Sequence, residues 1–167
     1  MAYANKTYVA FDADNDIHYY RLMQAWKESE NTTFDFHNAH DLNKLMGDSQ
    51  EETIKAKLRE RFDNAKLFVL LVGENTKYLY KFVRWEIEQA INRNLPIVVV
   101  NLNGKRSKDV DRCPAILNDV LTMHVSFNQK ILGRAINSWV NEHYRLKAEG
   151  KSGDYYYGNQ VYGSLGL

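Results

Sequence analysis

A chain of 167 residues has the usual length of one globular domain, and its 44% of hydrophobic residues are enough for one core. This composition excludes a wholly disordered chain, and a net charge of +1 gives no reason to expect nucleic acid or an anionic membrane as partner. The single cysteine, Cys113, excludes an intrachain disulfide, and no apolar run reaches the roughly 18 residues of a membrane span. Because no signal peptide is visible either, we expect a cytoplasmic protein.

Short apolar runs alternate with stretches of helical periodicity along the chain. The expected strands, in chain order, cover residues 8–11, 34–36, 67–72, 97–100 and 121–125. The expected helices cover residues 17–26, 49–65, 80–93 and 131–143. Because residues 67–72 are apolar at every position, this strand should be covered on both faces, as in the interior of a parallel sheet. The alternation predicts an α/β fold with a parallel, doubly wound sheet and helices on both faces.

The last part of the chain differs from the rest in composition. Residues 149–167 contain four tyrosines and five glycines and show no periodicity. We expect one folded domain over residues 1–148, followed by a Tyr/Gly-rich C-terminal tail over residues 149–167. This tail is either a flexible end or an arm whose tyrosines pack on a partner or on the domain itself.

The loops at one edge of the predicted sheet are the places to search for a site, because ligands of doubly wound sheets bind at the carboxyl ends of the strands. The glycine fingerprint of a dinucleotide-binding turn and the lysine-containing phosphate loop are both absent from the sequence. The acidic turn at residues 12–16 could hold Mg²⁺ as in a receiver domain. A receiver domain also needs an aspartate at the end of its third strand, and residues 72–74 offer none.

The helix expected over residues 80–93 carries a carboxylate beside its apolar face. Val83, Ile87 and Ala90 share one face, which must be the core face, and Glu86 lies on its flank. A carboxylate at the border of a core can be partly desolvated, and desolvation raises its pKa. Position alone does not decide whether Glu86 has a functional role or is a solvated surface residue.

Several other residues have both a structural and a functional interpretation. Asp14, Asn15 and Asp16 are typical helix caps, and caps at this edge of a sheet often also meet a ligand. His37 is expected in a polar loop, where bonding to backbone or water is the simpler interpretation. Trp85 is expected to point away from the core, toward the tail, another subunit or a ligand.

Three stretches, taken in order, resemble the TIR-like family that includes the ThsB proteins of Thoeris antiphage systems. They are residues 8–16 (YVAFDADND), 34–40 (FDFHNAH) and 82–90 (FVRWEIEQA). The resemblance extends over roughly residues 5–140. The third stretch is the most specific, because its amino acids, its position between a strand and a helix, and its order in the chain all fit the family.

The resemblance implies a flavodoxin-like fold with a five-stranded parallel sheet and helices on both faces. Catalytic TIR domains cleave the nicotinamide–ribose bond of NAD⁺ with a glutamate on the third helix, which falls on Glu86 in this sequence. Phe82 stands where the family usually has tryptophan, so an aromatic contact is kept while an indole N–H is not. The expected site has Glu86 as its catalytic residue and NAD⁺ as its substrate, with no metal and no separate cofactor.

The resemblance also implies a set of residues around the substrate. The expected substrate-binding residues are Phe11, Asp14, Asn15, Asp16, His37, Asn38, Phe82 and Arg84. Phe11 and the acidic turn would line the pocket, and His37 with Asn38 would lie across it. Arg84 could pair with a phosphate, or it could be a solvated surface residue.

The resemblance leads to two main hypotheses for the function. The first is an enzyme that converts NAD⁺ into nicotinamide and a cyclic ADP-ribose-type or related signal nucleotide, which switches on an effector protein in bacterial antiphage defence. The second is a non-catalytic TIR-like module that acts by self-association, as a homo-oligomer, or by binding a partner. A nucleoside-processing transferase on a similar fold is a third alternative. None of these hypotheses involves nucleic acid or a membrane.

Overall fold

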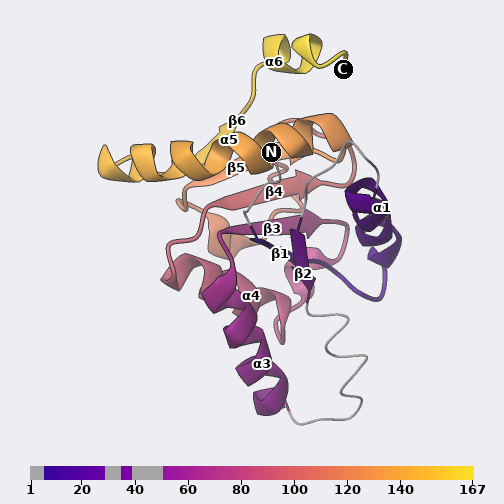
Figure 1. Cartoon of the computed structure of the whole chain (residues 1–167), viewed down its shortest axis with the longest axis vertical. Coiled ribbons are helices and arrows are strands. Elements are labelled where there is room, and N and C mark those ends of the chain that lie inside the picture. The colour runs from indigo at the N-terminus through magenta and orange to yellow at the C-terminus, as the bar shows by residue number, and fades with distance from the viewer. Residues whose placement is uncertain (1–5, 29–34, 39–50) are drawn as a thin grey trace.

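The computed structural model describes residues 6–28, 35–38 and 51–167 as a layered α/β fold (Figure 1). Within these residues the strands are β1 (Lys6–Ala10), β2 (Asp35–Asn38), β3 (Leu67–Val72), β4 (Ile97–Asn101), β5 (Thr122–Ser126) and β6 (Asp154–Tyr156). The helices are α1 (Ile17–Glu28), α3 (Glu51–Asn64), α4 (Val83–Asn92), α5 (Gln129–Ala148) and α6 (Asn159–Ser164), with short 3-10 helices η1 (Thr76–Tyr78) and η2 (Ala115–Leu117). Across the described ranges, no helix combines the length and the apolar character that crossing a membrane requires.

The strands form one sheet in the order β2-β1-β3-β4-β5-β6, and every neighbouring pair is parallel. The predicted flavodoxin-like class is thus confirmed, and β6 extends its five-stranded sheet by one strand. β3 and β4 are buried at every position, as expected for strands with helices on both faces. The winding reverses between β1 and β3, because β2 lies beyond β1 on one side and the later strands follow on the other.

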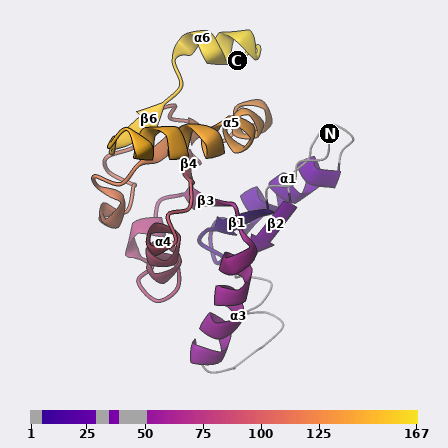
Figure 2. The ribbon, with the colours of Figure 1, turned by 60° about the vertical axis from the view of Figure 1, so that its left-hand side comes forward.

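Alternating side chains of the strands divide the interior into two apolar layers. Val9 and Val69 face the layer covered by α1, α5 and α6, whereas Tyr8 and Phe68 face the layer covered by α3 and α4. Figure 2 shows α3 and α4 on one side of the sheet and α1 and α5 on the other. A side chain on α4 can therefore reach only one set of strand residues, the set that includes Tyr8.

Several predicted boundaries differ from the structure, and two of these differences concern the elements that carry candidate site residues. The second strand was expected over residues 34–36, but β2 extends to Asn38 because its pairing with β1 continues that far, and Phe34 lies outside the described residues. The helix expected from residue 80 begins only at Val83, after η1 and a turn. Tyr80 in that turn is 65% exposed, so no core contact holds it in helical geometry. The start of the expected helix 49–65 also lies outside the described residues, which show α3 from Glu51 to Asn64.

The Tyr/Gly-rich segment packs on its own domain. Its strand β6 pairs with β5, and the side chain of Tyr162 in α6 is fully buried in the same apolar layer as α1 and α5. The Tyr162 hydroxyl accepts a hydrogen bond from the backbone N–H of Ser126 at 3.2 Å, and the guanidinium of Arg106 lies 4.1 Å from the ring centroid. Of the alternatives for this segment, the structure shows an arm folded against the rest of the chain.

Removing the buried ring should therefore destabilise the whole fold. We expect Tyr162→Ala to lower the free energy of unfolding by about 3 kcal/mol, because it leaves a cavity in the apolar layer. Urea denaturation followed by circular dichroism measures this change. Tyr156→Ala, at a tyrosine of the same segment that is 60% exposed, is the matched control and should change it by less than about 0.5 kcal/mol. Equal stability of the two variants would show that α6 is not anchored.

Candidate functional site

A cavity of about 380 Å³ opens at the carboxyl end of β1, beside the point where the winding of the sheet reverses. One wall is the turn that follows β1, and the other is the segment that leads into α4. The residues that line the cavity are Phe11, Asp12, Ala13, Asp14, Tyr78, Leu79, Tyr80, Lys81, Phe82, Val83 and Glu86. Its volume lies within the roughly 300–1,000 Å³ that small-molecule sites usually occupy.

Glu86 is the buried carboxyl group of this cavity. It lies in the first turn of α4 and is only 1% exposed, so the side chain expected on the flank of the core is in fact enclosed by it. The hydroxyl of Tyr8 donates a hydrogen bond to Glu86 Oε2 at 2.5 Å. Tyr8 is itself fully buried, with its ring stacked on that of Phe62 at a centroid distance of 3.9 Å. The donor is thus fixed by the packing of β1 against α3.

Burial decides the ionisation of Glu86. It raises the pKa of Glu86 to about 8, although the hydrogen bond from Tyr8 favours the charged form and acts in the opposite direction. Burial and the neighbouring Glu86 hold the pKa of Tyr8 well above its usual range, so Tyr8 remains an O–H donor. Near neutral pH the carboxyl group of Glu86 is therefore mostly neutral, and a positively charged ligand beside it would favour its ionisation.

The turn after β1 is held by the side chain of Asp12. Asp12 Oδ1 accepts hydrogen bonds from the backbone N–H groups of Asp14 and Asn15 at 3.1 and 3.3 Å, and its Oδ2 accepts one from Asn15 Nδ2 at 2.8 Å. These bonds form an Asx-type turn that presents Asp14 to the cavity. Asn15 is exposed and bonded to Asp12, so the structure places it outside the cavity lining.

Asp16, which was expected to bind the substrate, is not among the residues that line this cavity and lies against Gly73, the residue that follows β3. A Cβ atom on Gly73 would be 2.3 Å from Asp16 Oδ2, so only glycine permits this approach. Asp16 Oδ2 has no hydrogen-bond partner among the described residues. Burial and the charge of Asp12 raise the pKa of Asp16. In the same ranges no group of three or more His, Cys, Asp or Glu side chains is placed to hold a metal ion.

The residues at the start of α4 point in different directions. Phe82 lines the cavity with Glu86. Arg84 is exposed, pairs with Glu88 at 3.3 Å between Nε and Oε1, and lines a separate, neighbouring cavity. Trp85 packs edge-on against Phe62 of α3, which corrects the expectation that it points toward the tail, another subunit or a ligand.

His37 and Asn38 lie in strand β2 and not in the polar loop where His37 was expected. In the parallel register His37 pairs with Tyr8 and Asn38 with Val9. Their side chains lie outside the described part of the structure, so their contact with a substrate stays a prediction. Of the eight expected substrate-binding residues, the cavity thus brings Phe11, Asp14 and Phe82 together with Glu86.

Several residues of this site were not predicted from the sequence. Tyr8 was assigned only to a strand, although its hydroxyl in an otherwise apolar run could have indicated a polar partner on the covering helix. Tyr80 and Lys81 were also missed, because the turn that carries them was assigned to the helix, and Tyr78 was missed because it lies before that helix, in η1. The aromatic and basic residues that lie close together over residues 77–82 were the available signal.

A comparison with known protein families finds a match for the part of the chain that forms this site. Residues 8–107 match the family model described as Thoeris protein ThsB, TIR-like domain. The match covers more than half of the chain and includes the last three residues of β1 and all of β3 and α4, and with them Tyr8, Glu86 and both walls of the cavity.

The buried carboxyl group should make stability depend on pH. Below pH 4.5, the pKa of Glu86 in the unfolded chain, Glu86 is protonated in both the folded and the unfolded protein. Between pH 4.5 and about pH 8, Glu86 loses its proton in the unfolded chain but keeps it in the folded protein. Deprotonation therefore favours the unfolded chain in this range. Glutamine does not titrate, so Glu86→Gln should not lose stability in this way. We expect the free energy of unfolding of Glu86→Gln, relative to that of the wild type, to rise by roughly 1 kcal/mol per pH unit between pH 5 and 8.

Urea unfolding of both proteins across this pH range measures the effect. Glu88→Gln, the same substitution at a half-buried position on α4 that pairs with Arg84, is the control and should show no such rise. A stability difference between Glu86→Gln and the wild type that does not vary with pH would mean that Glu86 ionises normally in the folded protein.

Proposed function

This chain belongs to the TIR-like domain family of Thoeris ThsB proteins, and on that premise we propose that it is an NAD⁺-processing enzyme of bacterial antiphage defence. The observation that carries the proposal is the buried Glu86 at the strand-end cavity, hydrogen-bonded to Tyr8. A carboxyl group in such a place costs stability at neutral pH, and groups with perturbed pKa values cluster at functional sites. Its position on α4 is also the one that the family resemblance assigns to the catalytic glutamate.

The proposed reaction breaks the bond between ribose C1′ and the nicotinamide nitrogen of NAD⁺. Its electron pair leaves with nicotinamide, and the ribose is left with oxocarbenium-like positive charge. A carboxylate beside C1′ stabilises this charge, as in the hydrolysis of glycosides. Glu86 supplies that carboxylate, and the bond from Tyr8 fixes the orientation of the carboxyl group.

The raised pKa of Glu86 fits a cationic substrate. The nicotinamide ring of NAD⁺ carries a positive charge, and a charge of opposite sign in a cavity of low dielectric favours the ionised carboxylate. Binding of NAD⁺ would then release a proton from Glu86 and pair the new anion with the substrate. The carboxylate would be formed where the positive charge lies, with little solvation by water.

The fate of the ribose cation decides the product. Attack by a nitrogen of the substrate's own adenine forms the new bond at C1′ and releases one proton, which gives a cyclic ADP-ribose-type nucleotide; attack by water gives ADP-ribose. The aromatic side chains of Phe11, Tyr80 and Phe82 at the cavity would exclude water and favour the cyclic product. We propose that this nucleotide activates an effector protein in the bacterial cytoplasm.

A non-catalytic module that binds a partner is the second candidate function. Three features of the sequence favoured it. Phe82 lines the cavity, whereas Trp85 and the Tyr/Gly-rich segment are packed within the chain's own fold. The exposed tyrosines Tyr78 and Tyr80 at the cavity, 58% and 65% exposed, are the observation that now favours it. Measuring NAD⁺ loss over a range of protein concentrations, together with oligomer size, separates the two functions.

The proposed reaction depends on the charge of one side chain. We expect Glu86→Gln to lower the rate of nicotinamide release from NAD⁺ by at least about hundredfold, because the amide cannot become an anion. Chromatographic measurement of nicotinamide and of the nucleotide product tests this. Glu88→Gln is the matched control and should retain wild-type turnover. Circular dichroism of both variants checks the fold, and equal turnover in Glu86→Gln would refute the assignment.

A further inference from the structure

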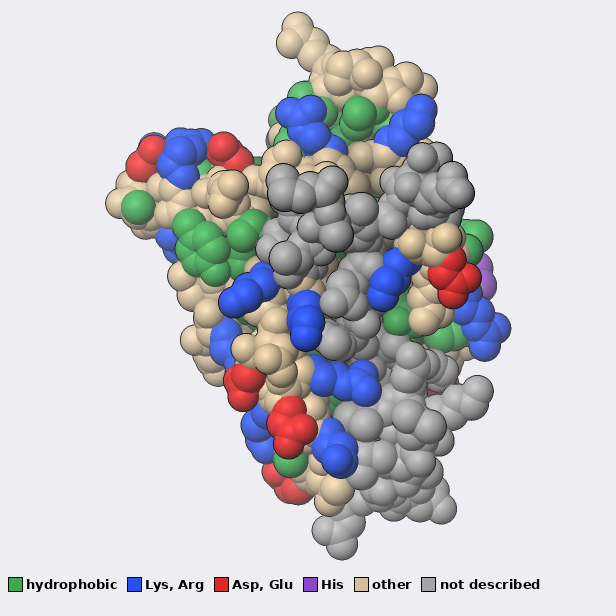
Figure 3. All heavy atoms as spheres, in the orientation of Figure 1, with side chains coloured by type: hydrophobic (Ala, Val, Ile, Leu, Met, Phe, Trp, Pro, Cys, Tyr) green, Lys and Arg blue, Asp and Glu red, His purple; other side chains and the backbone are tan. Residues whose placement is uncertain are grey.

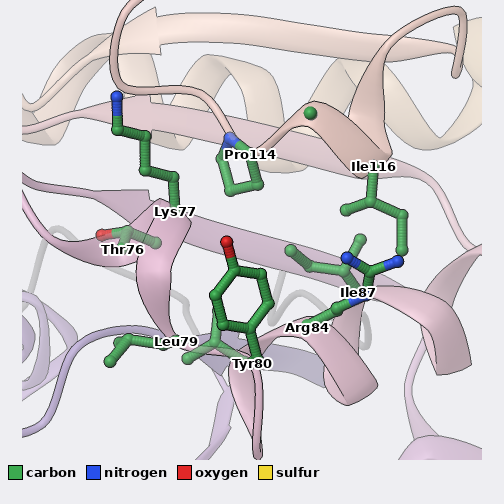
Figure 4. A pocket seen from close by; sticks show the side chains of 10 residues that line it. Thr76, Lys77, Leu79, Tyr80, Arg84, Ile87, Pro114 and Ile116 are labelled. Atoms are coloured by element: carbon green, nitrogen blue, oxygen red, sulfur yellow. The ribbon is translucent and has the colours of Figure 1, made fainter.

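A second, smaller cavity of about 100 Å³ lies next to the first, between α4 and the loop that leads into η2. Its lining residues are Thr76, Lys77, Leu79, Tyr80, Val83, Arg84, Ile87, Pro114, Ala115 and Ile116. Leu79, Tyr80 and Val83 line both cavities, so the two are separated only by this short segment. In Figure 4 the ring of Tyr80 stands in the middle of the cavity with its hydroxyl toward Pro114, and Ile116 reaches toward the guanidinium of Arg84.

The segment between the cavities brings aromatic and basic side chains close together. The ammonium of Lys77 lies 5.1 Å from the ring centroid of Tyr78, and that of Lys81 lies 5.4 Å from that of Phe82. The guanidinium of Arg84 lies 6.0 Å from the ring centroid of Tyr80. In the space-filling view, Lys and Arg side chains lie over α3 and α4, interspersed with Asp and Glu (Figure 3). Flat rings beside cations suit a ligand with both an aromatic base and phosphates.

The sizes of the cavities indicate one extended ligand. The smaller cavity is below the range of independent ligand sites, while the larger one has room for roughly one nucleotide of a dinucleotide. A substrate with its nicotinamide ribose at Glu86 must therefore extend beyond the first cavity. Tyr80 offers a surface in that direction, since its ring is 65% exposed and borders both cavities.

We propose that Tyr80 and the smaller cavity form the subsite for the adenosine diphosphate half of the substrate. Tyr80 stacks on the adenine ring, and the side chains of Arg84 and Lys81 bind the pyrophosphate. Identifying this half as part of NAD⁺ rests on the proposed function, but the affinity for adenosine diphosphate does not. Arg84 thus serves as a phosphate ligand from the second cavity.

The existing contacts of Arg84 and Lys81 leave both cations available to bind a phosphate. Arg84 and Glu88 are both about half exposed, and Lys81 lies 4.0 Å from Glu51 with 66% of its side chain exposed. Such surface pairs contribute little, so a phosphate can compete for the cations. Lys77 is different, because its ammonium donates to the backbone carbonyl of Asp111 at 2.6 Å. We therefore assign the phosphates to Arg84 and Lys81.

Direct binding of ADP tests the subsite without any turnover. Isothermal titration should show that Tyr80→Ala weakens ADP binding by about tenfold, the effect of losing one stacked base. Tyr80→Phe keeps the ring and should bind ADP like the wild type. Tyr156→Ala, at a tyrosine of similar exposure on β6, should also be unchanged. ADP binding of Tyr80→Ala that equals the wild type, or no ADP binding to the wild type at millimolar concentration, would overturn the proposal.

The phosphate contact has its own matched pair of variants. Arg84→Ala should weaken the binding of ADP by about fivefold. Adenosine, which has no phosphates, should bind to this variant as it does to the wild type. Arg145→Ala is the control, because Arg145 is also about half exposed on a helix and paired with a glutamate four residues on. An equal loss of affinity for ADP and for adenosine in Arg84→Ala would contradict the role of Arg84 in binding phosphate.

Failure of the subsite can be told from failure of the proposed reaction. If ADP binding depends on Tyr80 but NAD⁺ is not cleaved, the subsite stands and the reaction is refuted. If NAD⁺ is cleaved in a Glu86-dependent way and Tyr80→Ala leaves both KM and ADP affinity unchanged, the reaction stands and the subsite is refuted.

Discussion

The hydrogen bond between Tyr8 and Glu86 is the interaction on which the site depends. It joins the first strand to the first turn of α4 across 78 residues of sequence, in the apolar layer between the sheet and the helices α3 and α4. Enclosure raises the pKa of Glu86 from 4.5 to about 8, so the fold retains a carboxyl group that it is costly to ionise. A group of this kind responds strongly to any positive charge placed beside it, which the proposed reaction requires.

The architecture of the sheet places this pair at a ligand site. Because the winding reverses between β1 and β3, the turns after these strands separate and leave room at their carboxyl ends. The bonds of Asp12 fix the turn on one side, while Asp16 lies against Gly73 and is not among the residues that line the cavity. On the other side, η1 and the turn before α4 delay the helix, and their exposed tyrosines border the opening. The rigid layer thus holds Glu86, and the irregular segment shapes access to it.

Local patterns were enough to predict the fold class, because the strands β1 to β5 and the helices between them have their own apolar signals. The site was predictable in part: helical spacing placed Glu86 beside the core, and the family resemblance gave it a role. Its full burial was not predictable, since it depends on Tyr8 and Phe62 from distant elements. The path of Asp16 toward Gly73 likewise depends on how β1 pairs with β3. Three-residue β6 has no signal of its own and exists because β5 offers a free edge.

The ionisation of Glu86 in the folded protein tests the central claim most directly. Carbon-13 NMR of labelled glutamate carboxyl groups follows it, with the Glu86 signal identified by its absence in Glu86→Gln. The wild type should titrate with a midpoint near pH 8, and Tyr8→Phe should move the midpoint higher because the bond that favours the anion is lost. A wild-type midpoint near 4.5, or a midpoint unaffected by Tyr8→Phe, would contradict the account.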